Sequence, residues 1–128
     1  MKPAAEGMSA TLEIATDEAH TASAVGNPGV HVVATTALIL FLEEAAHRAI
    51  AGLYEEGEGS LGTRVEVDHV GACLAGTQVA ATARVLAVEG RKVTFAVEAR
   101  AGDKLLMTGR HQRVVVELAR FLKRHGLV

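Results

Sequence analysis

From Leu61 to Glu117 the apolar residues recur at every second position, with only three short interruptions. This alternation is typical of half-buried β-strands. The sequence therefore predicts four antiparallel strands that follow one another as a meander. They span residues 62–73, 77–89, 92–101 and 104–117. The interruptions suit tight antiparallel turns and read Leu74-Ala75-Gly76, Glu89-Gly90-Arg91 and Gly102-Asp103.

One long helix is predicted before these strands. Over residues 36–54 the apolar side chains recur at helical spacing, with Thr35 or Thr36 as the N-cap and Gly57 beyond the end. The first half of this segment is apolar almost all round. A helix of this kind is expected to be buried on most of its sides.

Three shorter segments complete the order of elements. A strand is predicted over residues 8–15, a loop at Gly26-Asn27-Pro28-Gly29 and a short basic helix over residues 118–125, while residues 1–7 are expected to form a flexible tail. One helix against one curled antiparallel sheet is an α+β arrangement. A chain of 128 residues has room for one such domain.

Composition and charge argue against several classes of function. Thirteen basic and fifteen acidic residues leave a net charge of −2, too weak a field to attract nucleic acid or anionic lipid. The longest nearly apolar stretch is shorter than the ~20 residues of a membrane span, and the N-terminus lacks the apolar segment of a secretory signal. The single Cys73 has no partner for an internal disulfide or a thiolate metal cage. We therefore expect a cytoplasmic protein that binds neither nucleic acid nor membranes.

Two polar side chains lie among apolar neighbours. His69 shares one face of its predicted strand with Val65 and Val67. Glu43 lies in a helical turn with apolar neighbours, and a buried carboxylate must be paired, protonated or functional. Two alternatives stay open at this point: a neutral core histidine bonded to backbone, and a partly exposed glutamate paired with His47 at i+4.

Known site motifs are otherwise missing from the sequence. It has no His-Glu-x-x-His zinc motif, no glycine-rich phosphate loop and no Gly-x-Ser-x-Gly elbow. Glu44-Ala45-Ala46-His47 matches the Glu-x-x-His of di-iron bundles, but a second helix of this kind is lacking. Arg110-His111-Gln112-Arg113 could bind an anion or form a solvated edge strand. We expect no metal and no cofactor.

Six short segments, taken in order, carry a resemblance to a known family. They read Val33-Ala34-Thr35, Glu43, Ser60-Leu61-Gly62-Thr63, His69, Val88-Glu89-Gly90-Arg91 and Gly109-Arg110-His111-Gln112-Arg113. Their order and spacing over residues 8–118 resemble the hotdog-fold acyl-CoA thioesterases of the fluoroacetyl-CoA thioesterase type. The resemblance implies the hotdog fold, in which an antiparallel sheet wraps one long helix. It also implies a homodimer, or a higher assembly, with its sites at the subunit interface.

The same resemblance assigns a function and site residues. It implies hydrolysis of a short or medium acyl-CoA to the free acid and coenzyme A. Thr35, Glu43 and His69 become the catalytic trio. Gly62 is placed near the acyl carbonyl, and Arg113 contacts coenzyme A. The physics agrees with these roles, because free N–H groups at a helix start favour developing negative charge and eight residues bring Glu43 back to the side of Thr35.

Two other functions stay open on the sequence. A non-catalytic acyl-CoA binding module would keep Arg113 and the pocket but would not need Glu43 or His69. An enoyl-CoA hydratase-like enzyme on the same fold is disfavoured, because the helix carries Glu43 and no Asp. Residues 1–40 contain no Phe, Tyr or Trp, so a pocket bounded by the glycine-rich loop is expected to discriminate acyl groups by size alone and hence broadly.

Overall fold

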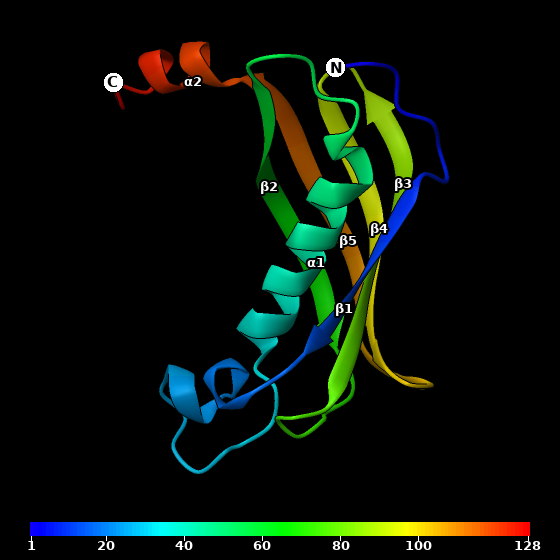
Figure 1. Ribbon diagram of the computed structural model, residues 1–128, viewed down its shortest axis with the longest axis vertical. Helices are drawn as coiled ribbons and strands as arrows, with labels where there is room; N and C mark the ends of the chain where they lie inside the picture. The colour runs from blue at the N-terminus through cyan, green and yellow to red at the C-terminus, as the bar shows by residue number, and fades with distance from the viewer.

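The structure is a computed structural model that describes residues 1–128. Five strands form one antiparallel sheet in the order β1-β3-β4-β5-β2, and one long helix lies against its concave face (Figure 1). The strands are β1 (Ser9–Ala15), β2 (Glu58–His69), β3 (Gln78–Glu89), β4 (Lys92–Ala101) and β5 (Lys104–Glu117). The helices are α1 (Thr35–Ala51) and α2 (Leu118–Arg124), with short 3-10 helices η1 (Glu18–His20) and η2 (Ser23–Val25). This is the two-layer α+β arrangement that the sequence predicts.

The core lies between α1 and the inner face of the sheet. Every second residue of β3, β4 and β5 is buried over most of each strand, as period-two strands require. The buried face of α1 is rich in alanine, which lets the helix pack closely on the strands. Its fully buried residues include Leu38, Leu42, Ala45, Ala46 and Ile50.

The strand order differs from the predicted meander at β2. Strands β3, β4 and β5 follow one another through two-residue turns, as predicted. β2 spans residues 58–69 rather than 62–73, and it pairs with β5 at the edge of the sheet. Leu74-Ala75-Gly76 therefore lies in the connection that leads from the edge strand β2 across to β3, and it is not a hairpin turn. Alternation shows which face a residue takes but not which strand it pairs with.

A β-bulge in β2 decides which residues face α1. The register against β5 shifts between Gly62 and Arg64, which leaves Thr63 as the extra residue. Strict alternation would give Gly62 and His69 opposite faces. With the bulge, both residues face inward. The position of Gly62 opposite the buried Arg113 shows its inward direction.

Helix α1 begins one residue earlier than predicted. Its N-cap is Ala34, rather than Thr35 or Thr36, and no side chain caps the first turn. The Ala34 N–H donates to the His20 carbonyl at 2.8 Å, which fixes the chain where the helix starts. Thr35 is thus the first helical residue, and its hydroxyl is free for another partner. No helix of the structure has both the length and the apolar character to cross a bilayer.

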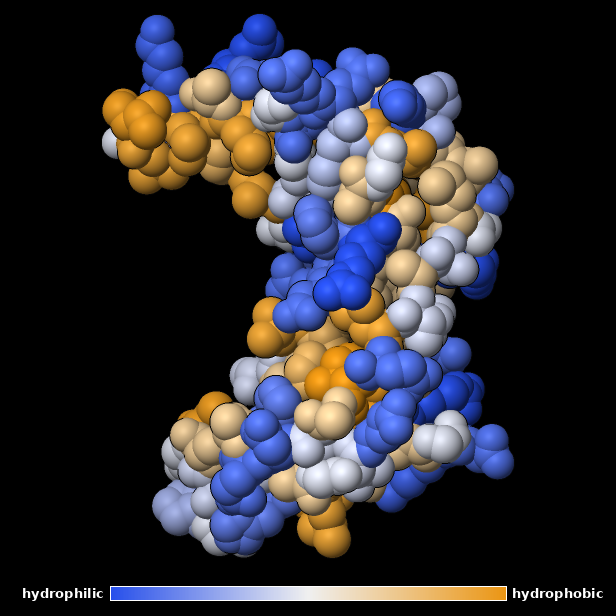
Figure 2. Space-filling view, viewed as in Figure 1, coloured by the Kyte–Doolittle hydropathy of each residue, from blue (hydrophilic) through white to orange (hydrophobic).

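One side of α1 remains uncovered next to the edge strand. Leu40 is 53% exposed, and Val65, on the inner face of β2, is 39% exposed. The expectation that the helix is buried on most sides is therefore wrong for a single chain. In the view of Figure 2 the molecule is hollowed on the side of β2, between α2 and the η1–η2 segment.

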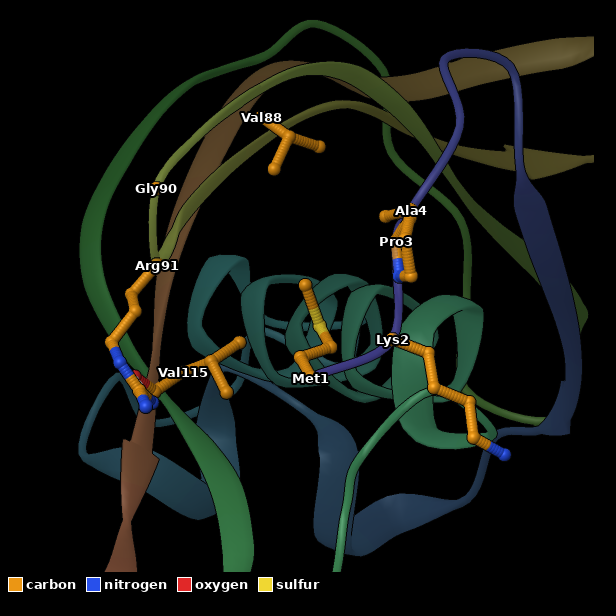
Figure 3. A pocket seen from close by; sticks show the side chains of 8 residues that line it. All are labelled: Met1, Lys2, Pro3, Ala4, Val88, Gly90, Arg91 and Val115. Carbon is orange, nitrogen blue, oxygen red and sulfur yellow. The ribbon is translucent and has the colours of Figure 1, made fainter.

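Residues 1–7, where the sequence predicts a flexible tail, run along the end of the sheet that lies beside the C-terminus of α1. The Lys2 N–H donates to the Leu53 carbonyl at 2.8 Å, just beyond the C-terminus of α1. The Met1 amino group forms a 2.7 Å ion pair with Glu58. A pocket lies between this segment and the turn at Gly90 (Figure 3). None of the predicted site residues lines this pocket.

Candidate active site

Thr35 and His69 meet where α1 begins and β2 ends. Thr35 Oγ1 and His69 Nδ1 are 2.7 Å apart, within hydrogen-bonding distance. The helix supplies Thr35 as its first residue, and the edge strand supplies His69 as its last. Both residues are exposed to solvent. A hydroxyl bonded to an imidazole is the pair used in nucleophilic and acid–base catalysis.

Glu43 lies two turns further along α1 and faces β5. Its Oε2 is 3.5 Å from Nη1 of Arg113, and its side chain is 38% exposed. The alternative that Glu43 pairs with His47 is wrong, because His47 Nδ1 lies 3.0 Å from the Tyr54 hydroxyl instead. Burial, with the positive charges of Arg113 and Arg48, lowers the pKa of His47 and keeps it neutral at pH 7.

Gly62 brings the backbone of β2 close to Glu43. A Cβ atom at this position would lie 2.8 Å from Glu43 Oε2 and 3.0 Å from Cε1 of His111. Any side chain here would force the carboxylate or the imidazole to move. Glu43 can therefore take its observed position only because residue 62 is a glycine.

Arg113 is buried on the inner face of β5, where three residues bind its guanidinium. It is 7% exposed. Nε donates to Ser60 Oγ at 2.8 Å and Nη2 donates to the Ser60 carbonyl at 3.0 Å. Nη1 lies 3.1 Å from His111 Nε2 and 3.5 Å from Glu43. Four of its five N–H donors are thus engaged within the chain. The contact of Arg113 with coenzyme A stays a prediction.

The five predicted site residues form two groups within one chain. Thr35 and His69 make one group, and Glu43, Gly62 and Arg113 make the other. Eight residues separate Thr35 from Glu43, and at 1.5 Å per residue this is a distance of about 12 Å along the helix axis. One small acyl group cannot touch both side chains in the same chain.

Polar neighbours of Arg113 are not among the five predicted site residues. The alternative of a solvated edge strand at Arg110-His111-Gln112-Arg113 is wrong, because β5 lies between β4 and β2. Tyr54 and Ser60 hydroxyls are 2.5 Å apart, and Ser60 in turn accepts from Arg113. His111 is 1% exposed and shares the inner face with Arg113. The signal was present in β5, because His111 and Arg113 have the parity of the buried Val115. Polar residues at apolar positions of a strand indicate a buried network.

The chain offers a limited set of reactive groups for chemistry. No three His, Cys, Asp or Glu side chains lie together in a way that could hold a metal ion. Burial raises the pKa of the Cys73 thiol, which is therefore protonated at pH 7. Among the predicted site residues, the nucleophilic and acid–base groups are the Thr35 hydroxyl, the His69 imidazole and the Glu43 carboxylate.

Known structures place this fold among the hotdog proteins of the thioesterase superfamily. A hypothetical protein of Thermus thermophilus, a thioesterase superfamily member, is 30% identical with a TM-score of 0.91, over 98% of this chain and 93% of that one. A variant of the fluoroacetyl-CoA-specific thioesterase, in complex with fluoroacetate and CoA, is 32% identical with a TM-score of 0.84, over 92% and 99% of the two chains. The predicted hotdog fold is confirmed.

The chain belongs to the family of fluoroacetyl-CoA-specific thioesterases. The family model matches residues 16–119. The fluoroacetyl-CoA thioesterase of Streptantibioticus cattleyicolor is 40% identical over 90 residues, which are 70% of this chain and 65% of that protein. The aligned part is thus slightly less than two thirds of that relative. The resemblance found in the sequence is confirmed, while most of α2 lies outside the matched residues.

Proposed function

We propose that this protein is an acyl-CoA thioesterase that hydrolyses a short or medium acyl-CoA to the free acid and coenzyme A. The observation that carries the proposal is the 2.7 Å contact between Thr35 Oγ1 and His69 Nδ1 at the start of α1. Membership of a thioesterase family supports the thioester as the bond that is cleaved. The cytoplasmic location expected from the sequence is part of the same proposal.

His69 acts as the base and then as the acid. The attacking oxygen, from Thr35 or from a water molecule beside it, gives its proton to the imidazole and bonds to the acyl carbon. The first turn of α1 has no side-chain cap, so its N–H groups can donate to the oxyanion. The C–S bond then breaks, and the departing thiolate takes the proton from His69. When Thr35 attacks, the acyl group is left as an ester on its Oγ1, and Glu43 takes a proton from the water that hydrolyses this ester to the free acid. When water attacks, the free acid forms directly as the C–S bond breaks.

A homodimer brings the two groups of site residues together. β2 is an edge strand with a row of unpaired backbone groups, and Leu40 lies exposed beside it. A two-fold axis perpendicular to β2 pairs this strand antiparallel with its copy and covers Leu40. Glu43 of one protomer then completes the Thr35–His69 pair of the other. This arrangement removes the separation of about 12 Å that one chain imposes.

Gly62 and Arg113 bind the thioester end of the substrate. The family resemblance implies that Gly62 lies near the acyl carbonyl, and its missing Cβ lets the Glu43 carboxylate lie close to the backbone of β2. Arg113 is too deeply buried to reach a group that stays on the surface. Its predicted contact is therefore with the pantetheine end that enters the site, and Arg113→Ala is expected to raise KM.

Release of free thiol from a panel of acyl-CoAs tests the proposed function. The panel contains acetyl-, fluoroacetyl-, butyryl- and hexanoyl-CoA, and His69→Ala purified in the same way controls for contaminating thioesterases. We expect turnover of several members by the wild-type protein and little by the variant. Binding of these compounds without thiol release would instead identify a non-catalytic acyl-CoA module.

A further inference from the structure

His111 is a buried histidine to which the proposed reaction assigns no step. Its Nδ1 lies 2.8 Å from the Arg64 carbonyl, and its Nε2 lies 3.1 Å from Nη1 of Arg113. A carbonyl oxygen only accepts and a guanidinium only donates. Nδ1 therefore carries the hydrogen and Nε2 accepts, which fixes the imidazole in one neutral tautomer.

Arg113 is oriented by groups on both sides. The hydroxyl and the carbonyl of Ser60 bind Nε and Nη2, so the far side of the guanidinium is anchored on β2. Nη1 donates one hydrogen to His111 and has its second toward Glu43. The acceptor on His111 thus determines where that second hydrogen points. No buried polar side-chain atom in the structure lacks a partner, so loss of one acceptor disturbs a complete network.

We propose that His111 is a positioning residue that holds Arg113, and through it the Glu43 carboxylate, in the geometry used for thioester hydrolysis. The kinetic part of this inference rests on the proposed function. Gly62 is part of the same arrangement, because a Cβ there would lie within 3.0 Å of both the carboxylate and the imidazole.

The arrangement is sensitive to acid. A proton on Nε2 would place an N–H donor against the Nη1 donor of Arg113, and the hydrogen bond would break. The charged groups facing His111 are Arg113 from β5 and Glu43 from α1, while β4 contributes only the uncharged ring of Phe95 and β2 the Arg64 carbonyl. Burial and the charge of Arg113 outweigh the Arg64 hydrogen bond and the charge of Glu43, and they lower the pKa of His111. Activity is therefore expected to survive mild acid and then fall as His111 is protonated.

Two substitutions separate the hydrogen bonds of His111 from its bulk. His111→Gln supplies an amide N–H for Arg64 and an amide oxygen for Arg113, and it cannot titrate. His111→Leu supplies neither bond. His125→Gln removes an exposed histidine beyond α2 and serves as the matched control.

Kinetics with the most rapidly hydrolysed acyl-CoA of the panel give the first readout. We expect His111→Leu to lower kcat about 10- to 100-fold, the effect of a misplaced reacting group, with KM within about threefold. His111→Gln should keep most of the neutral-pH kcat and lose the part of the acid decline that His111 causes. Wild-type kcat in His111→Leu, or a wild-type acid decline in His111→Gln, would overturn the inference.

Crystal structures of the two variants give a readout that does not depend on activity. The contact between Arg113 Nη1 and Glu43 Oε2 should be kept in His111→Gln and lost in His111→Leu. An Arg113–Glu43 contact that persists in His111→Leu would contradict the inference, whether or not the protein hydrolyses acyl-CoA. Lack of acyl-CoA hydrolysis by the wild-type protein would count only against the proposed function. If His111→Leu does not fold, the acid decline and the Arg113 contact of His111→Gln decide.

Discussion

At the scale of single residues, the two inward-facing histidines His69 and His111 have different surroundings and therefore different proposed roles. His69 is exposed and touches the hydroxyl of Thr35, so it can exchange a proton with a bound substrate. His111 is buried and bonded through both ring nitrogens, so it can only hold its neighbours in place. The open edge of the sheet is thus where the chemistry is expected.

Loss of either acid–base group should abolish most of the activity. We expect Glu43→Gln and His69→Ala each to lower kcat by about 10² or more, the contribution of a positioned acid or base. Thiol release measures the rates, and circular dichroism checks that the fold persists. His125→Gln should behave like the wild-type protein. A folded His69→Ala protein with nearly full activity would remove His69 from the mechanism.

Acid should destabilise the fold through its histidines. The pKa values of His111 and His47 are lowered from 6.5 in the folded protein, so the unfolded chain binds more protons as the pH falls below this value. The contribution of these histidines to the free energy of unfolding is therefore greatest above about pH 6.5 and decreases on acidification, by at most about 1.4 kcal/mol per pH unit for the buried His111. Urea unfolding at several pH values measures this. His111→Gln should show a shallower decrease, and an unchanged slope would count against a neutral buried His111.

Sequence parity predicts the inward face of His69 but not the surroundings of Arg113. His69 lies on the bulge-free half of β2, where alternation holds. Gly62 lies beyond the bulge, and its inward direction came only from the family resemblance. The pairing of Arg113 with Glu43 joins residues 70 positions apart, and no local pattern encodes such a contact.

At the scale of elements, the edge strand β2 is the feature that most needs a partner. It is twelve residues long, mostly exposed and paired on one side only. Long exposed edges invite pairing with another chain. The alternation of apolar residues predicts this strand. Its position at the edge depends on pairing with β5, which lies much further along the sequence.

A charge on the uncovered side of α1 should dissociate the dimer. Leu40 is 53% exposed in one chain, so Leu40→Lys leaves the fold of the protomer intact but places an unpaired charge in the proposed interface. We expect a monomer by sedimentation velocity and a loss of hydrolysis. Thr94→Lys, on the outer face of β4, is the control and should remain an active dimer. An active Leu40→Lys monomer would show that one chain is sufficient.

The loop before α1 should give broad selectivity. Gly26 and Gly29 both have positive φ angles, 107° and 83°, so this turn requires residues without side chains. The loop therefore offers little bulk to select an acyl group. We expect kcat/KM for fluoroacetyl-CoA to exceed that for acetyl-CoA by less than about 10⁴, since pocket size separates close homologues by about 1–3 kcal/mol. A larger ratio would show that selectivity arises without aromatic rings.

At the scale of the whole molecule, the fold could be predicted and the complete site could not. One apolar helix followed by period-two strands defines the α+β class, and the ordered motifs identify the family. Thr35 and Glu43 lie about 12 Å apart along α1, and in the proposed dimer each protomer supplies part of one site. A single sequence carries no direct signal of which protomer supplies Glu43.

Subunit mixing tests the proposed composite site most directly. His69→Ala and Glu43→Gln are each expected to be nearly inactive. Dissociated and reassembled together, they form mixed dimers in which one site has wild-type Thr35, His69 and Glu43. Thiol release should then recover to about one quarter of the wild-type rate, because half of the dimers are mixed and each has one intact site of two. No recovery, with mixed dimers verified by mass spectrometry, would contradict a site shared between protomers.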